Sequence, residues 1–253
     1  MLRICLLLIA AAAAWYVPAV QAADYETWLQ APLAVRDQTP GNWKVNLGLG
    51  YGSAPKYRGA RSATGFLLPV IDMEWRGRVF ISTVRGVGIN WVHASDTLFG
   101  PRITYDAGRK ESLDASLAGT GDIKGGYEAG VFFVHFSGPW RFDGDIRQRV
   151  TSGPKDVRAT LGATIGGPIA ANANLFFGAR VEYDGSKYNE AYYLDAGAGI
   201  TNVITYMAVV RELGGGTYLG FDGQVGRLLG PASKNPLTRN TLYFAGVTTG
   251  HRF

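Results

Sequence analysis

The chain has 253 residues, with 25 Lys and Arg against 20 Asp and Glu and a formal net charge of +5. This length fits one domain, and the basic residues are scattered rather than gathered in the stripe that a nucleic-acid surface needs, so no nucleic-acid partner is expected. The 35 glycines, 13 tyrosines, 12 phenylalanines and 6 tryptophans favour short strands, tight turns and aromatic girdles at a membrane surface.

The N-terminus has the pattern of a secretory signal peptide. One early arginine precedes an apolar run over 4–14, and small residues lead to a predicted cleavage site after Ala22. The alternative, a membrane anchor, is disfavoured because Pro18 and the polar residues that follow leave the apolar run too short. We therefore expect residues 1–22 to be removed. Cys5, the only cysteine, leaves with them, so we expect a mature chain without thiols or disulfides.

After the signal peptide, residues 23–41 show little periodicity and are expected to form a flexible lead-in. The first predicted strand covers 42–51, where apolar and polar or small residues alternate. A loop over 52–59 joins it to a second strand near 64–75, which alternates in the same way.

The region from 78 to 125 leaves the strand count open. Residues 79–92 fit either one long bent strand or two short strands broken at Arg85-Gly86. Clean alternation resumes at 99–106, and a weaker strand is predicted over 112–118. Ten to twelve strands result, and twelve is the preferred number.

From Tyr127 onward the alternation is regular. Strands are predicted near 127–136, 140–150, 157–167, 173–183, 197–212, 217–229 and 240–253. Short links between them alternate with longer polar links at 151–156, 184–192 and 230–238. This alternation is typical of the periplasmic turns and extracellular loops of a membrane barrel.

The strand at 140–150 indicates which side faces the membrane. One parity carries Trp140, Phe142, Ile146 and Val150, and the other carries five charged residues. The apolar face is too aromatic to lie in water, and the charged face is too dense for a hydrophobic core. A strand that is apolar outward and charged inward belongs to a transmembrane barrel. The predicted fold is therefore all-β: an antiparallel up-and-down transmembrane β-barrel over 42–253.

The same parity rule predicts a charged lumen. Its members are Arg102, Asp106, Arg141, Asp143, Asp145, Arg147, Arg149, Arg158, Arg180 and Glu182. The preferred interpretation is a mutually neutralising network that fills and stiffens the barrel. The alternative is a small-solute pore whose arginine-biased wall favours anions. The interior of an eight-stranded barrel is filled by side chains, and a sixteen-stranded barrel has an open channel. A count of ten to twelve strands therefore does not distinguish the filled barrel from the pore.

No catalytic or metal site is predicted. The three histidines, His93, His135 and His251, lie on expected strands or strand ends, and none has a metal-ligand spacing. Ser95 and Asp96 lie near His93, which weakly suggests a barrel lipid hydrolase, but a polar loop is the preferred interpretation. We expect no enzymatic activity, no cofactor and no metal.

Short motifs in a fixed order carry a resemblance to a known family. They are Gly50-Tyr51, Pro55-Lys56-Tyr57-Arg58-Gly59, Leu68-Pro69, Leu117-Ala118-Gly119, Gly121-Asp122-Ile123, Glu128-Ala129-Gly130, Pro139-Trp140, Arg147-Gln148, Tyr188-Asn189, Tyr192-Tyr193 and the terminal Phe253. In this order and spacing the chain resembles the MipA/OmpV family of outer-membrane proteins over about 42 to 253. Within the motif loop, Pro55, Tyr57, Arg58 and Gly59 are the residues that the resemblance singles out.

The resemblance implies an outer-membrane barrel, in a family with one member described as a scaffold that joins a murein hydrolase to a murein synthase. Two loops depart from the family pattern: the link after Tyr193 is shorter, and the segment 230–236 lacks the usual acidic run. Partner binding through these two loops is therefore not carried over.

The sequence predicts a non-enzymatic barrel in the outer membrane of a Gram-negative cell, in contact with outer-membrane lipid. The resemblance implies an envelope scaffold with periplasmic murein hydrolase or synthase proteins as partners. The alternative is a narrow, anion-biased channel. A soluble lipocalin-like binder is a distant third.

Overall fold

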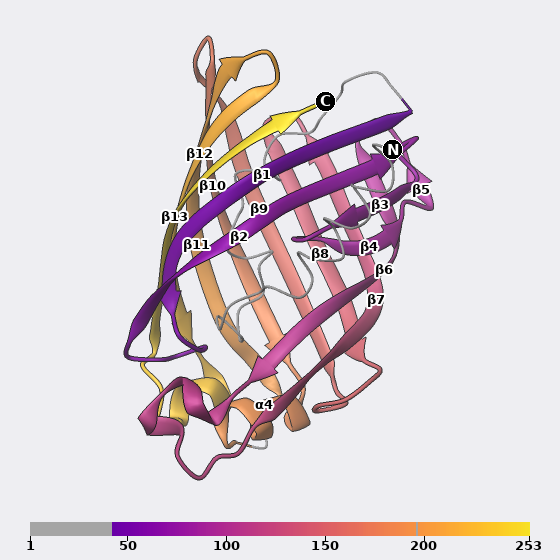
Figure 1. Ribbon diagram of the computed structural model, residues 1–253. Helices are drawn as coiled ribbons and strands as arrows, with labels where there is room; N and C mark the ends of the chain where they lie inside the picture. The colour runs from indigo at the N-terminus through magenta and orange to yellow at the C-terminus, as the bar shows by residue number, and fades with distance from the viewer. Residues whose placement is uncertain (1–41, 196) are drawn as a thin grey trace, which may run out of the picture.

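The computed structural model describes residues 42–195 and 197–253 (Figure 1). The predicted signal peptide, 1–22, and the predicted lead-in, 23–41, lie outside the described residues. No helix among the described residues is long and apolar enough to cross a membrane.

Antiparallel strands make up the structure, and they form one 13-stranded sheet. Twelve of them close into a barrel because β4 also pairs with β6, and β5 is an extra strand beside β6. The strands are β1 (Trp43–Pro55), β2 (Ala63–Trp75), β3 (Val79–Ser82), β4 (Gly86–Ile89), β5 (Val92–His93), β6 (Thr97–Arg109), β7 (Ile123–Ser137), β8 (Trp140–Arg149), β9 (Val157–Ala170), β10 (Ala173–Asp184), β11 (Gly199–Gly214), β12 (Thr217–Leu228) and β13 (Thr241–Arg252). The predicted fold and the preferred count of twelve are confirmed.

The open choice for residues 79–92 is decided in favour of short strands, with the break next to Gly86. Two local predictions are corrected. Residues 52–55, predicted as loop, continue β1. The strand predicted over 112–118 is wrong, because this segment forms two 3-10 helices, η1 (Glu111–Leu113) and η2 (Ala115–Leu117). Leu117 packs with Tyr57 and Ala60, and Leu113 packs against this cluster, so the segment is held by contacts with the 56–62 loop and not by a strand neighbour.

The predicted polar link at 184–192 contains a helix, α4 (Ser186–Tyr193). Its N-cap, Gly185, has no side chain to accept the first N–H groups. Asp156 replaces the cap, because its carboxylate accepts the N–H of Lys187 at 2.6 Å and that of Tyr188 at 3.4 Å. The helix ends at Leu194, whose φ of 57° is left-handed.

Inside and outside alternate along the strands as the sequence predicts. On β8, Trp140 and Ile146 are 42% and 58% exposed, whereas Asp143 and Asp145 are each 6% exposed. The outward faces of the other strands add an apolar belt that includes Leu49, Leu67, Ile103, Leu161, Phe177, Phe221 and Val225. An apolar band on the outside of a closed barrel is the surface that lipid requires.

Aromatic pairs border this belt at both ends. Trp43 lies 6.5 Å from Trp75 between ring centroids, and Tyr105 lies 5.2 Å from Tyr127. The first pair lies beside the short turns at 76–78, 138–139, 171–172 and 215–216, and the second beside the longer loops at 56–62, 110–122, 150–156, 185–198 and 229–240. Short turns are periplasmic and long loops extracellular in such barrels. The start of β1, at Trp43, and the end of β13, at Arg252, are therefore both on the periplasmic side.

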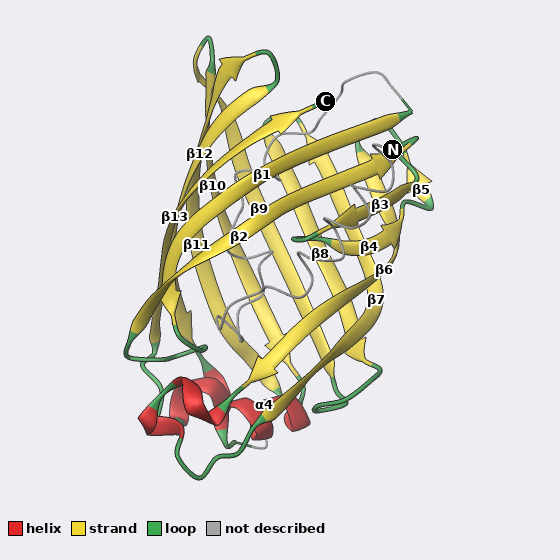
Figure 2. Ribbon diagram, in the orientation of Figure 1, coloured by secondary structure: helices red, strands yellow, loops and turns green. Residues whose placement is uncertain are grey.

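The extracellular end is covered by the short helices (Figure 2). Together with η3 (Gly230–Lys234), α4 buries Tyr188, Tyr192, Tyr193 and Leu228 in one cluster. The extracellular end thus holds a buried cluster that comes mainly from the loops, with Leu228 from the end of β12.

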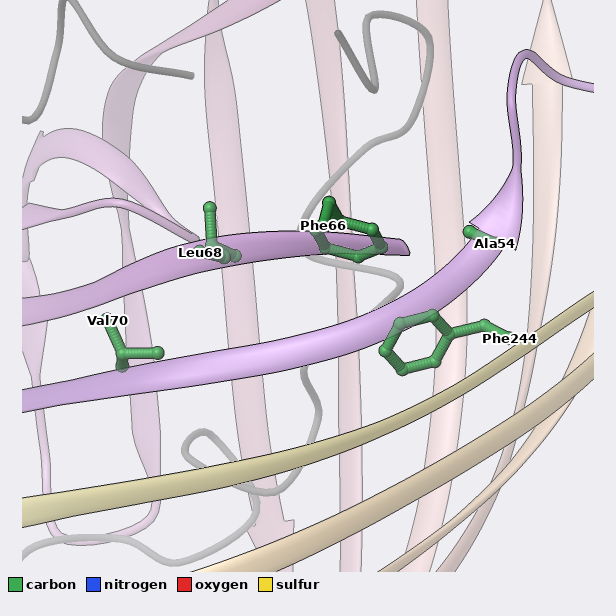
Figure 3. Packing of buried hydrophobic residues seen from close by; sticks show 5 residues of the cluster. All are labelled: Ala54, Phe66, Leu68, Val70 and Phe244. Atoms are coloured by element: carbon green, nitrogen blue, oxygen red, sulfur yellow. The ribbon is translucent and has the colours of Figure 1, made fainter. Parts of the chain in front are cut away.

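A second apolar cluster lies on the inner wall of β1, β2 and β13 (Figure 3). Phe66 and Phe244 lie 6.1 Å apart between ring centroids. Their rings need the glycine at position 52, since a Cβ there would come within 2.5 Å of the Phe244 ring. We call this cluster the apolar wall; its members are Ala54, Phe66, Leu68, Val70 and Phe244.

The orientation of the belt predicts a depth-dependent cost of charge. Leu161 and Ile169 lie on β9 and are each 60% exposed, but Leu161 is central and Ile169 is close to the periplasmic turn. We expect Leu161→Arg to lower the free energy of unfolding by about 2–4 kcal/mol and Ile169→Arg by about 0–1 kcal/mol. Unfolding titrations in lipid vesicles measure both; equal costs would contradict the assigned depth.

Candidate functional site: a charged lumen with a tyrosine cap

The charged residues predicted for the lumen come from four strands, β6, β8, β9 and β10, which lie close together in the sheet order. Every second residue of each strand points inward, so neighbouring strands bring their charges into one layer. Arg141 is partly buried, with 13% of its side chain exposed, and the other nine are buried. The structure therefore gathers the set on one inner wall, opposite in character to the apolar wall.

Two aspartates bind the central arginines. Asp145 accepts from Arg102 at 2.5 Å and from the Thr160 hydroxyl at 2.8 Å. Asp143 pairs with Arg180 at 2.9 Å and with Arg141 at 3.2 Å. Each of these carboxylates thus joins strands that are not neighbours in sequence, β8 with β6 and β8 with β10.

A second group lies nearer the extracellular end. Arg147 and Arg158 face each other directly across β8 and β9, which would be repulsive without a bridging anion. Glu128 supplies it, at 3.2 Å from Arg147 and 3.6 Å from Arg158. Arg149 pairs with Asp106, and Asp184 lies 2.8 Å from Arg158.

Two of these carboxylates, Glu128 and Asp184, were not predicted for the lumen. Glu128 has the inward parity of β7, so the alternation rule applied to the strand at 127–136 would have found it. Asp184 is the last residue of β10 and falls just beyond the predicted strand. Both change the charge balance of the site.

The motif loop folds over the top of this wall. Arg58 lies 3.0 Å from Glu182 and 3.6 Å from Asp184, and the Tyr57 hydroxyl is 2.9 Å from that of Ser116. Gly59 has a φ of 85°, and its carbonyl accepts the N–H of Arg239 at 2.6 Å. Pro55 ends β1 just before the turn. The loop thus joins the extracellular loops to the charged wall.

Helix α4 places tyrosines above the arginines. The rings of Tyr188 and Tyr192, four residues apart, stack at 4.2 Å, and Arg158 lies 4.3 Å from the Tyr188 ring. The Tyr192 hydroxyl donates to Asp106 at 3.0 Å. Burial raises the pKa of Tyr188 and of Tyr192 well above the usual value, so both phenols stay neutral.

The arrangement offers paired charges rather than a reactive centre. Among the described residues, no group of three or more His, Asp or Glu side chains could hold a metal. His135 and His251 contact the hydroxyls of Thr97 and Thr217 at 2.9 and 3.0 Å. His93, Ser95 and Asp96 are all exposed at the periplasmic end. These residues form no enclosed site in the structure.

A closed antiparallel barrel with an apolar belt, aromatic borders and a charged interior is an outer-membrane β-barrel. The family model described as MltA-interacting protein MipA matches residues 47–253, and the chain belongs to this family. No curated protein matches the chain.

Several solved structures are similar. An outer membrane channel from Pseudomonas putida F1 has 14% sequence identity and a TM-score of 0.40, covering 87% of this chain and 100% of that one. OmpT, an outer membrane protein of Vibrio cholerae, has 9% identity and a TM-score of 0.39, covering 83% and 98%. Neisserial surface protein A has 9% identity and a TM-score of 0.26, covering 84% and 96%. Because these TM-scores are below 0.5, the assignment as an outer-membrane β-barrel depends on the family match and on the closed strand order of this chain.

The contacts of Arg58 predict a large cost for its removal. Arg58→Ala leaves Glu182 and Asp184 buried without this partner, so we expect the free energy of unfolding to fall by about 3–5 kcal/mol. Lys234→Ala is the matched control, because Lys234 is 71% exposed and lies 3.7 Å from Asp195, and it should change stability little. Denaturant titration compares them; equal effects would show that Arg58 does not stabilise the wall.

Proposed function

We propose that the protein is a non-conducting scaffold of the outer membrane that binds a murein hydrolase of the MltA type at its periplasmic face. The observation that carries the proposal is the buried, paired state of the lumen charges. Only 3% of the Arg147 side chain and 1% of the Arg149 side chain are exposed to solvent. A conducting pore needs charges that face water and exchange partners with a passing ion.

The charge balance also argues against an anion filter. The predicted set holds six arginines and four carboxylates, an excess of two positive charges. Adding Glu128 and Asp184 makes six against six, and the excess disappears. Arg58, which lies against two carboxylates, and the buried residues Arg109 and Asp222 make the count eight arginines against seven carboxylates. The interior is close to neutral, which suits a filled barrel better than a selective one.

The tyrosine cap supports the same proposal. Tyr188, Tyr192 and Tyr193 are 3%, 3% and 1% exposed, and they lie over the extracellular end of the charged wall. A partner in the periplasm meets the opposite end, where the turns are short and both strand ends of the chain lie. The two loops that depart from the family pattern are extracellular, so they lie away from such a partner.

A narrow anion channel remains the second candidate function, and the arginine-rich strand β8 favours it. The two candidates predict different outcomes when one lumen carboxylate is removed.

We expect Asp145→Ala to lower the free energy of unfolding by about 3–5 kcal/mol, because Arg102 loses its 2.5 Å partner inside the barrel. Single-channel recordings in a planar bilayer should show negligible current for the native protein and for the variant. Asp96→Ala, at an exposed position of the periplasmic rim, is the control and should change neither property. A stable Asp145→Ala barrel that passes anion current would reject the scaffold proposal in favour of the channel.

Partner binding is tested with the reconstituted barrel and a purified murein hydrolase of the MltA type. Arg76 and Arg78 are exposed on the periplasmic turn between β2 and β3. Reversing both charges, Arg76→Glu with Arg78→Glu, should slow association several-fold, since rim charges act mainly on the association rate. Lys155→Glu, on an extracellular loop, is the control and should have no effect. Surface plasmon resonance measures both; no binding by the native barrel would refute the partner.

A further inference from the structure

The barrel wall has a break in its strand ladder. The strand β3 pairs with β2 only over Asp72–Trp75, and β4 pairs with β6 only through Val87 with Ile103 and Gly88 with Arg102. Within the described chain, β2 over 63–70 and β6 over 104–109 therefore have a strand neighbour on one side only, β1 and β7 respectively. We call the break between these two edges the window; it lies between β2 and β6 in Figure 1.

Loop contacts border the window at both of its ends. At the periplasmic end, the β3–β4 turn is held to β2, because the N–H of Thr83 donates to the carbonyl of Ile71 at 2.8 Å. At the extracellular end, Asp114 accepts from the Ser62 hydroxyl at 2.7 Å and lies 3.7 Å from Lys56. The hydrogen bond from Ser62 and those from Ser116 lower the pKa of Asp114 to about 2, so this contact is ionised at neutral pH.

The window extends from the apolar belt to the outer aromatic border. Leu67 is the cross-strand partner of Tyr51, and Tyr105 on the opposite edge is paired with Tyr127. All four side chains point outward and are more than half exposed. Next to Tyr105, lipid head groups and water can satisfy the backbone groups of the β6 edge. The β2 edge reaches into the apolar belt, where Pro69 has no N–H that needs a partner.

The apolar wall lies directly behind one edge of the window. Phe66, Leu68 and Val70 are the inward residues of the same stretch of β2 whose outward residues border the window. Leu67, on the lipid belt, and Leu68, in the barrel interior, are consecutive residues, so the apolar character is continuous across this edge; Phe66, Leu68 and Val70 are 5%, 3% and 1% exposed because they pack in one cluster. This continuity matches an occupant that is apolar along one part and polar at its end.

An added strand is the other occupant that an open edge invites, and Pro69 disfavours it. Ile71 directs its N–H and carbonyl toward Thr83, on the window side of β2. Residues two apart in an antiparallel strand point the same way, so the nitrogen of Pro69 faces the window and has no N–H to donate. A proline at this position is typical of an edge that stays unpaired.

We propose that the window admits an acyl chain of a membrane lipid, which contacts the apolar wall while its head group stays at the outer border. This inference is independent of the scaffold proposal, since a barrel closed to ions along its axis can still take a lipid chain from the side.

The experiment uses the full chain, with Cys5→Ala as the background because Cys5 is the only cysteine. A fluorescent bimane label is attached at Leu68→Cys, and the protein is reconstituted in phosphatidylcholine vesicles containing a lipid with a nitroxide midway along its acyl chain. Leu161→Cys is the lipid-facing reference. Ile204→Cys is the matched control, because Ile204 is also inward, apolar and 5% exposed, but it lies between two fully paired strands.

We expect the nitroxide to quench the label at position 68 about as strongly as the label at 161 and several-fold more than the label at 204. Equal quenching at 68 and 204 would overturn the proposal. The proposal would also be overturned if the label at 68 were not quenched and chemical cross-linking showed that the protein is a dimer in the vesicles. A second copy would then cover the window. If Leu68→Cys does not give the heat-modifiable folded form, Val70→Cys, 1% exposed on the same wall, provides the same comparison.

Discussion

Closure of the strand ladder is the constraint on which the rest of the structure depends. Hydrocarbon offers no partner to a backbone N–H or carbonyl, so a spanning sheet has to satisfy its own edges. Here the first and last strands join over a long register, from Asn46 with Arg252 to Ser53 with Ala245. The ring is completed elsewhere, through the two residue pairs between β4 and β6. A closed ring then determines which side chains face lipid and which face one another.

The inward side chains had to be compatible with that enclosure. Burying a charge costs free energy unless an opposite charge and hydrogen bonds compensate it. The facing pair Arg147 and Arg158 would repel without Glu128, and Asp145 joins Arg102 to Thr160 across the interior. These contacts link strands that the ladder alone leaves apart. Their contribution is to specify how β6 to β10 stand relative to one another, as much as to stabilise the barrel.

Much of this could be predicted from alternation along single strands. The eleven residues from Trp140 to Val150 were sufficient to predict a membrane barrel, its outward face and the inward set on β8. Alternation could not predict α4, because the side chain that caps it, Asp156, belongs to a different loop. It also failed at 112–118, where Leu113 and Leu117 pack against a distant loop. Contacts between loops leave no period in the sequence, so the cap of the barrel appeared only in the structure.

The uneven closure of the ring has a consequence for how the protein comes apart. Local opening begins where the fewest backbone hydrogen bonds must break, and it costs less than global unfolding. In this barrel that place is the β3–β4 hairpin, not the junction of the first and last strands. We therefore expect the amide protons of Val79–Ile89 to exchange with solvent before those of β1 and β13. Partial unfolding is then expected to separate the β3–β4 hairpin from β6, while the first and last strands, β1 and β13, stay paired.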